Sequence, residues 1–201
     1  MIELKVLQAV RLKGRIGQDD IASTTGEDPA TVADAVRAVI EAGLLIEGKT
    51  IRISPEGRTR LSELLAGERE KGDQDAIAVA YDKFRSINAD FKALVSDWQL
   101  KNGEPNPHDD DEYDAAVLAR LADVHRRVTP VNAAVANEIP RLASYSDKLQ
   151  AALTKVQAGE TAWLTRPIVD SYHTVWFELH EELILAAGLT RESEAQAGHA
   201  H

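Results

Sequence analysis

The chain has 201 residues, 44% of them hydrophobic, and a formal net charge of −10. This length allows one or two domains with substantial hydrophobic cores. The absence of cysteine excludes disulfides, thiolate metal sites and a cysteine nucleophile, and it suits a reducing compartment. No apolar run approaches the roughly 18 residues that a membrane span needs, and no N-terminal signal pattern is present. We therefore expect a cytoplasmic protein that does not contact a membrane.

Acidic and basic residues are distributed unevenly along the chain. Residues 1–72 contain 11 Lys and Arg against 12 Asp and Glu, whereas residues 73–201 contain 12 against 21. The nearly neutral first part holds two clusters of basic residues: Arg11, Lys13 and Arg15, then Lys49, Arg52, Arg58 and Arg60. Such cations can bind a phosphate backbone while the acidic part faces away. The alternative is that they are ordinary solvated surface charges.

Three short helices are predicted at the start of the chain. The first, over residues 2–13, has apolar residues on one face at three- and four-residue spacing: Ile2, Val6, Leu7 and Val10. A second helix contains Ile21 and ends near Gly26. Asp28 and Pro29 then supply an N-cap and a first-turn proline for the third helix. Two short helices joined by a glycine-containing turn predict a helix-turn-helix, with the later helix placed for recognition.

The segment from Gly43 to Thr50 allows two interpretations, because it satisfies the P-loop pattern G-x-x-x-x-G-K-[ST]. A P-loop follows a strand and opens a helix. Here a helical pattern precedes Gly43, and residues 50–53 alternate between polar and apolar as a strand does. We therefore predict that Gly43 ends a helix and that Glu47-Gly48-Lys49 is a tight turn between two strands. A nucleotide site is the less favoured alternative.

Residues 2–66 resemble the winged-helix domain of bacterial transcription regulators, particularly the MarR-like group. The matching segments are Ile21-Ala22 followed by Gly26, Thr31-Val32, Glu41-Ala42-Gly43-Leu44-Leu45 and, after the hairpin, Ser54-Pro55-Glu56-Gly57-Arg58. The resemblance covers about a third of the chain, and it implies that the partner is double-stranded DNA. The implied contacts are Thr31, Asp34 and Arg37 in the major groove, Lys49 and Arg52 at the wing, and Arg58 at phosphate. We also expect a homodimer, because one winged helix reads only a few base pairs.

A charged segment bracketed by glycines, residues 67–75, is predicted to link the winged-helix domain (1–66) to a second domain (76–189). Apolar stripes at helical spacing recur through the second domain, starting between Ile77 and Trp98, and no strand pattern appears. Three prolines there are expected to mark helices: Pro130 and Pro140 start or bend them, and Pro167 begins the last. Residues 190–201 are small and polar and are predicted to form a flexible tail. The fold class is therefore mostly α, a winged helix-turn-helix with a small β-hairpin wing followed by an antiparallel helical bundle.

Two features of the predicted bundle are candidate sites. The acidic run Asp109–Glu112 could hold a hard cation, but carboxylates at a helix N-terminus more often complement the helix dipole. In the last helix, His173 and His180 lie on one face beside Trp176, and His125 of an earlier helix could approach them. The two histidines of the last helix are about 10 Å apart along its axis, too far to share one ion, so no metal is expected. These four residues are a candidate effector pocket; hydrogen-bonded histidines in plain core packing are the alternative.

No Ser-His-Asp order, G-x-S-x-G motif or cleft with paired carboxylates is recognisable, so neither an enzyme nor a cofactor is expected. The sequence thus predicts a DNA-binding transcription regulator whose helical domain dimerises and binds a small-molecule effector. The alternative is a winged-helix module that binds protein or senses a ligand without sequence-specific DNA binding. The third helix favours this alternative, because Arg37 is its only cation against Asp34 and Glu41.

Overall fold

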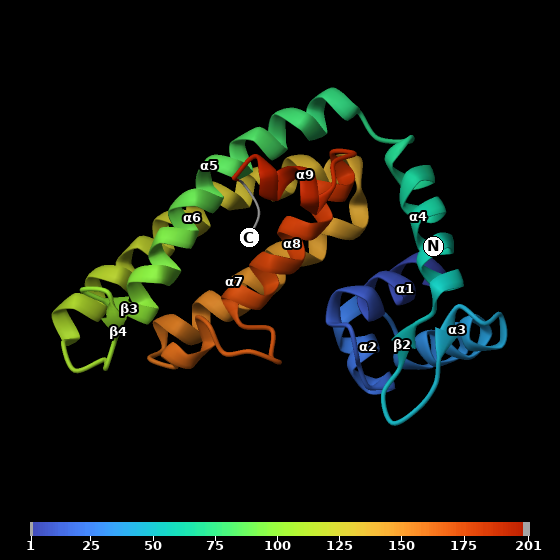
Figure 1. Ribbon diagram of the computed structural model, residues 1–201, viewed down its shortest axis with the longest axis horizontal. Helices are drawn as coiled ribbons and strands as arrows, with labels where there is room; N and C mark the ends of the chain where they lie inside the picture. Colours follow the sequence, from blue (N-terminus) through green and yellow to red (C-terminus); the bar gives the residue numbers. More distant parts are fainter. Residues whose placement is uncertain (1, 199–201) are drawn as a thin grey trace. The chain divides into compact units, whose positions relative to one another are not determined.

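The computed structural model describes residues 2–198, and most of them are helical, as predicted (Figure 1). The chain divides into two compact units, Met1–Lys71 and Gly72–His201, called unit 1 and unit 2 below. The division falls inside the segment predicted as a linker. Among the described residues, no helix is both long and apolar enough to cross a bilayer.

Unit 1 combines helices with one antiparallel hairpin. In chain order its elements are α1 (Ile2–Lys13), α2 (Gln18–Thr25), α3 (Pro29–Glu41), β1 (Leu45–Ile46), β2 (Arg52–Ile53) and α4 (Pro55–Arg69). Gly26, at φ 68°, ends α2, and the Asp28 side chain caps α3 by accepting from the backbone N–H of Thr31. The core contains apolar residues from every element, among them Val6, Leu7, Ile21, Val36, Leu45, Ile53 and Leu61.

The hairpin pairs Leu45 with Ile53 and Ile46 with Arg52. An isolated bridge between Ile16 and Ile51 adds the α1–α2 connection to its edge. Gly43, at φ 73°, lies just beyond α3, and Lys49 is exposed between the strands. The segment that matches the P-loop pattern therefore follows a helix and forms a strand, a turn and the approach to a second strand, which is the reverse of the P-loop context.

The start of α4 is fastened to the start of the hairpin by two residues. The Ser54 hydroxyl donates to the Gly43 carbonyl at 2.7 Å and accepts from the Gly57 N–H at 2.9 Å. Gly57 lies so close to the chain that a Cβ placed there would be 2.0 Å from the Leu44 carbonyl oxygen. Glycine is therefore required at position 57 by close approach, since no side chain fits between α4 and the hairpin.

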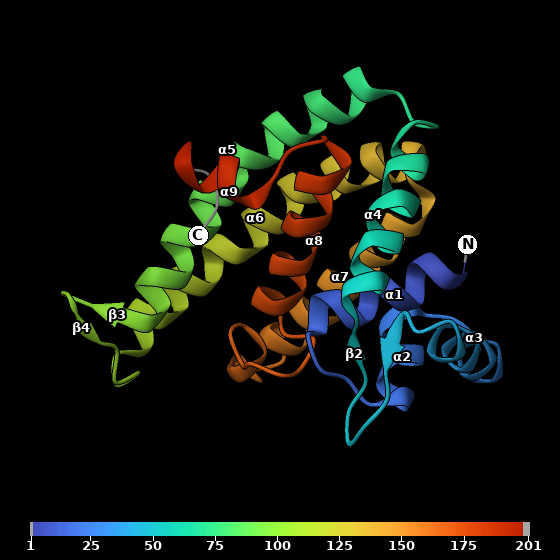
Figure 2. The same cartoon turned by 45° about the vertical axis from the view of Figure 1, so that its right-hand side comes forward.

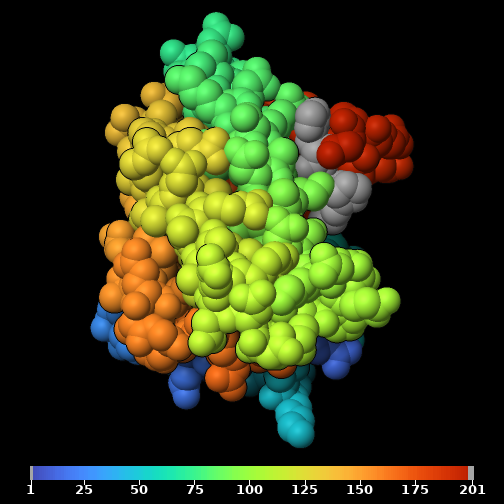
Figure 3. All heavy atoms as spheres, turned by 90° about the vertical axis from the view of Figure 1, so that its left-hand side faces the viewer, coloured from blue at the N-terminus to red at the C-terminus, as the bar shows by residue number. Residues whose placement is uncertain are grey.

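Unit 2 is built on four long helices with short connecting elements. In chain order these are α5 (Gln74–Gln99), β3 (Leu100–Lys101), β4 (Glu104–Pro105), α6 (Asp111–Glu138), the 3₁₀ helix η1 (Pro140–Ala143), α7 (Ser144–Gln157), the 3₁₀ helix η2 (Thr161–Trp163), α8 (Tyr172–Ala186) and α9 (Arg191–Gln196). Two ion pairs show that α5 and α6 are antiparallel: Asp90 pairs with Arg127, whereas Asp97 pairs with the earlier Arg120. Figure 3 shows α5 in green and α6 in yellow side by side.

The long helices contact one another in sequence, α5 with α6, α6 with α7, and α7 with α8, and α8 returns to α5 (Figure 2). Their inner faces form one core, which includes Phe84, Phe91, Leu121, Val128, Leu149, Tyr172, Trp176 and Leu179. The proline predictions fare differently. Pro130 does not start a helix, because it lies inside α6, where the buried Val128 and Val131 keep the chain packed on both sides. Pro167 lies in a loop, and α8 begins only after Ser171, whose side chain caps it.

A short hairpin of β3 and β4 joins α5 to α6, although no strand pattern is recognisable in the sequence of this half. Its turn residues, Asn102 and Gly103, have φ of 56° and 86°, the left-handed pair that type I′ turns require. The strands are two residues each, too short for an alternating pattern to be visible in the sequence.

The prediction of a flexible tail from residue 190 is wrong for residues 191–196, which form α9. Thr190 and Ser193 make a capping box at its start. Glu194 is 2% exposed and anchors the helix to α5. The helix was not predicted because it has no apolar stripe; polar groups hold it in place. The predicted tail residues 199–201 lie outside the described residues.

Candidate functional site

The outer face of α3 carries the three residues predicted to enter the major groove. Thr31, Asp34 and Arg37 are all exposed, while Val32 and Val36 of the same helix are buried in the core. The Thr31 hydroxyl donates to the Asp28 carboxylate at 3.0 Å. Arg37 and Asp34 form an exposed ion pair at 3.1 Å. The face is therefore polar but carries little free positive charge.

The hairpin and the α1–α2 connection carry cations that form no ion pair with the described residues. Ile16 and Ile51 exchange backbone hydrogen bonds of 3.2 and 2.9 Å, and both side chains are buried. Their neighbours Arg15 and Arg52 therefore lie opposite each other beside the bridge. The two arginine side chains are on the exposed face, away from the buried side chains of Ile16 and Ile51. Lys49 is exposed at the turn of the same hairpin. We call Arg15, Lys49 and Arg52 the hairpin cations.

None of the hairpin cations forms an ion pair with another residue in the described part of the chain. Arg58, in the first turn of α4, is exposed and similarly without an ion pair. Arg60 differs, because it binds Glu3 through two nitrogens and also lies 3.5 Å from Glu63. The sequence indicated Arg15 only as part of a separate basic cluster with Arg11 and Lys13. Its position beside Arg52 was not predicted, because it depends on the bridge between Ile16 and Ile51.

In unit 2, a pocket of about 250 Å³ opens between α5 and α8. Its lining includes Phe91, Lys92, His173, Trp176, Phe177 and His180, so the structure brings together three of the four residues predicted for an effector site. The Trp176 indole N–H donates to Asn88 at 2.9 Å, and its ring centroid lies 4.4 Å from that of Phe91. The indole is thereby fixed in orientation, with its polar atom satisfied.

Both histidines of this pocket favour the neutral form. Burial lowers the pKa of His173, and burial together with the positive charge of Arg191 lowers the pKa of His180 to about 4. Near pH 7 they therefore offer hydrogen-bonding nitrogens and no charge. Lys92 is a cation of the lining and is half-buried. An aromatic floor, neutral imidazoles and one lysine suit a small amphipathic ligand with a negative group.

His180 also links the pocket to α9. Its Nε2 lies 3.3 Å from the Tyr81 hydroxyl, which donates to Glu194 at 2.7 Å. Arg85 binds the same carboxylate at 2.5 and 3.1 Å and lies over the Tyr81 ring. On the other side, Arg191 of α9 pairs with Glu181 and covers the ring of Phe177, with 4.6 Å between the guanidinium carbon and the ring centroid. The helix α9 thus supports one wall of the pocket.

His125 does not line this pocket, so the expectation that it joins the other three residues is wrong. Its Nδ1 lies 3.2 Å from the Tyr172 hydroxyl, and its Nε2 lies 3.1 Å from the side-chain oxygen of Gln150. Partial burial lowers the pKa of His125. Packing against Tyr172 places the imidazole among α6, α7 and α8, away from the α5 side on which the pocket opens.

The acidic run before α6 has a structural use. Asp110 caps the helix by accepting from the Tyr113 N–H at 3.0 Å, and it pairs with Lys101 at 2.9 Å. The hydrogen bond from Lys101, more than any other interaction, lowers the pKa of this carboxyl. Within residues 2–198, no group of three or more His, Asp or Glu side chains is placed to hold a metal ion.

No protein-family model, no curated protein and no solved structure matches the chain.

Proposed function

We propose that the chain is a DNA-binding transcription regulator, with unit 1 as a winged-helix domain of the MarR-like kind. The hairpin cations are the observation that supports this most. Arg15, Lys49 and Arg52 are exposed on one small β structure, and none of them forms an ion pair with a described residue. Like charges on neighbouring strands repel. A polyanion such as the DNA backbone removes that repulsion, and it gains the entropy of released counterions on binding.

The order of elements in unit 1 suits this role. A short helix, a turn, a longer helix with an exposed polar face and a hairpin follow one another, as in winged-helix domains that set the later helix in the major groove. In that arrangement the hairpin cations and Arg58 contact phosphate. Arg37 reaches a base only if it leaves Asp34, so phosphate contacts provide most of the affinity. We therefore expect strongly salt-dependent binding with modest sequence selectivity.

The test is the salt dependence of binding to a labelled DNA duplex, followed by fluorescence anisotropy. Replacing the three hairpin cations with Ala should weaken binding to all sequences alike. It should also flatten the slope of log K against log salt by about 2.7, because each lost phosphate contact contributes about 0.9. The matched control removes three cations from unit 2: Arg120, Arg126 and Lys155. It should leave the slope unchanged, because these residues lie outside the proposed interface.

Unit 2 is proposed to be the pairing and effector-binding part, with the α5–α8 pocket as the effector site. His173→Gln and His180→Gln keep hydrogen-bonding capacity and approximate size but remove the imidazoles. We expect both variants to bind DNA like the parent. An aromatic carboxylate that changes the DNA affinity of the parent should not change that of the variants. If such a compound acts equally on the parent and on both variants, the effector site lies elsewhere.

A protein-interaction module is the second candidate function, and the ion pair between Asp34 and Arg37 is the observation that favours it. With its only arginine paired, α3 presents a nearly neutral face on which Glu41 is also exposed. Such a face suits a protein surface better than a polyanion. An unchanged affinity and salt slope in a folded triple variant of the hairpin cations would support this candidate over DNA binding.

A further inference from the structure

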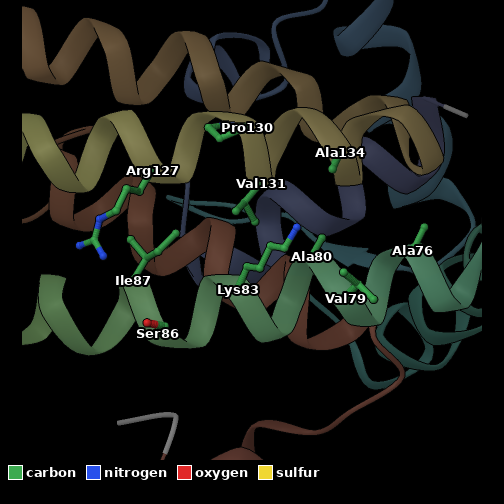
Figure 4. A pocket seen from close by; sticks show the side chains of 10 residues that line it. All are labelled: Ala76, Val79, Ala80, Lys83, Ser86, Ile87, Arg127, Pro130, Val131 and Ala134. Atoms are coloured by element: carbon green, nitrogen blue, oxygen red, sulfur yellow. The ribbon is translucent and has the colours of Figure 1, made fainter.

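A second hollow lies on unit 2, along the solvent-facing side of the α5–α6 pair, and we call it the α5–α6 groove (Figure 4). Its volume is about 550 Å³, within the range of about 300–1,000 Å³ typical of small-molecule sites. It shares no lining residue with the α5–α8 pocket. Nothing in the proposed DNA contacts or the proposed effector site uses it.

The groove is hollow because small side chains line it at helical spacing. Ala76 and Ala80 of α5 face Ala134 of α6, while Ile87 and Val131 form part of its floor. Val79 is 56% exposed beside them, an apolar side chain left in water. Covering such a surface is favourable in proportion to the apolar area removed from water. The shape and the lining therefore suit an apolar body of small size.

Lys83 gives the groove its charge. It rises from α5 and extends across the groove towards α6 (Figure 4). It forms no ion pair with any residue in the described ranges. Arg127 also lines the groove, but its guanidinium is neutralised by Asp90 at 2.7 Å and Asp123 at 2.9 Å. Lys83 is thus the uncompensated charge of the lining, between an apolar end at Ala76 and a more polar end at Ser86.

We propose that the α5–α6 groove binds an amphiphilic organic anion. The apolar body lies between Val79 and Ala134, and the negative head lies at Lys83. A second copy of the chain fits this face less well. Since Lys83 is near the middle of the groove, symmetric pairing would bring two ammonium groups together, where like charges are costly. Nucleic acid fits poorly too, because residues 73–201 contain 21 acidic against 12 basic residues and repel a polyanion.

The first experiment titrates the full chain with decanoate, and with decanol as the uncharged analogue, by calorimetry. We expect saturable binding of one decanoate per chain, weakened about fivefold by Lys83→Gln, which corresponds to one exposed ion pair. Decanol should bind the parent and Lys83→Gln equally. The matched control is Lys155→Gln, in α7 and outside both the groove and the α5–α8 pocket, and it should leave decanoate binding unchanged. Lys92→Gln tests the α5–α8 pocket, and loss of decanoate binding in this variant alone would place the ligand there and overturn the proposal.

The second experiment fills the groove. Ala134→Phe places a ring in the hollow from an exposed position of α6, and it should abolish decanoate binding without unfolding the helix. Ala133→Phe, also exposed but not lining the groove, is its control and should bind like the parent. Equal binding to both variants overturns the proposal. So does the absence of saturable binding to the parent. A third contrary result is a molar mass of Ala134→Phe, measured without ligand, that differs from the molar mass of the parent and of Ala133→Phe. The groove would then be an interface between two copies of the chain.

Discussion

Replacing Gly57 with Ala adds one methyl group where α4 meets the hairpin of unit 1. The new Cβ would lie 2.0 Å from the Leu44 carbonyl oxygen, whereas unstrained carbon–oxygen contacts are about 3.3 Å or longer. The strand must therefore move by about 1.3 Å to restore that contact distance. Such a shift strains or breaks the bonds of Ser54 to Gly43 and Leu44, at 2.7 and 3.1 Å.

Each of those bonds contributes about 1 kcal/mol net, and overpacking costs about 1–3 kcal/mol. Alanine is intrinsically favoured over glycine in a helix by about 1 kcal/mol, which offsets part of this. We therefore expect Gly57→Ala to lower the free energy of unfolding of unit 1 by about 3 kcal/mol, a large share of the 5–15 kcal/mol typical of a domain. DNA binding should weaken in parallel, because the hairpin that carries Lys49 and Arg52 is displaced.

The chain offers both a control and a selective assay for this change. Gly67 lies in the same helix α4, and a Cβ there meets no atom within 4 Å. Gly67→Ala should therefore stabilise unit 1 by up to about 1 kcal/mol. All Trp, Tyr and Phe residues lie between Tyr81 and Phe177, so tryptophan fluorescence reports unit 2 alone. In urea titrations of the two variants, the unfolding transition followed by far-ultraviolet circular dichroism should shift, whereas the transition followed by fluorescence should stay unchanged. Equal unit 1 stability in the two variants would refute the close-approach argument.

Three further predictions concern unit 2 and the whole chain. Glu194→Gln should destabilise unit 2 by about 1–3 kcal/mol, because Arg85 and Tyr81 lose a charged acceptor. Replacing the exposed Glu192 with Gln on the same helix should have no effect. Equal urea midpoints of the two variants, followed by fluorescence, would contradict this prediction. His180 has a folded-state pKa of about 4, below its unfolded value of about 6.5. Its contribution to stability is therefore complete above pH 6.5 and falls towards pH 4 by up to about 1.4 kcal/mol per pH unit; His180→Gln should flatten that dependence, and an unflattened curve would exclude this histidine as its source. Light scattering of the intact chain at tens of micromolar should show a dimer, whereas unit 1 alone should be a folded monomer with much weaker DNA binding; a monomeric intact chain would contradict the proposed pairing.

Patterns confined to a few consecutive residues predicted the local structure well. Asp28-Pro29 indicated the start of α3, and the alternation after Thr50 indicated the strand that ends at Ile53. The apolar stripe from Ile77 to Trp98 is the buried face of α5. In each case the physical signal is periodic burial or a cap, and both are written in neighbouring residues.

Contacts between distant residues were not predictable in the same way. The position of Arg15 beside Arg52 depends on a bridge between residues 16 and 51. His125 was grouped with His180 because both belong to apolar helix faces. The apolar face of a helix, however, does not determine which other helix packs against it. Helix α9 was taken for a flexible tail because its anchor is a carboxylate whose partners lie in α5. These placements follow from tertiary packing, which the local spacing of apolar residues does not reveal.

The contact between Glu194 and Tyr81 joins residues 113 positions apart, and this separation affects how unit 2 can form while the chain is being synthesised. Translation adds roughly 5–20 residues per second, so α5 precedes Glu194 by several seconds. During that interval the α5–α6 pair can form from local contacts, but Tyr81 and Arg85 have no carboxylate to bind. We therefore expect the wall of the α5–α8 pocket that α9 supports to be among the last parts of the protein to become ordered at the ribosome.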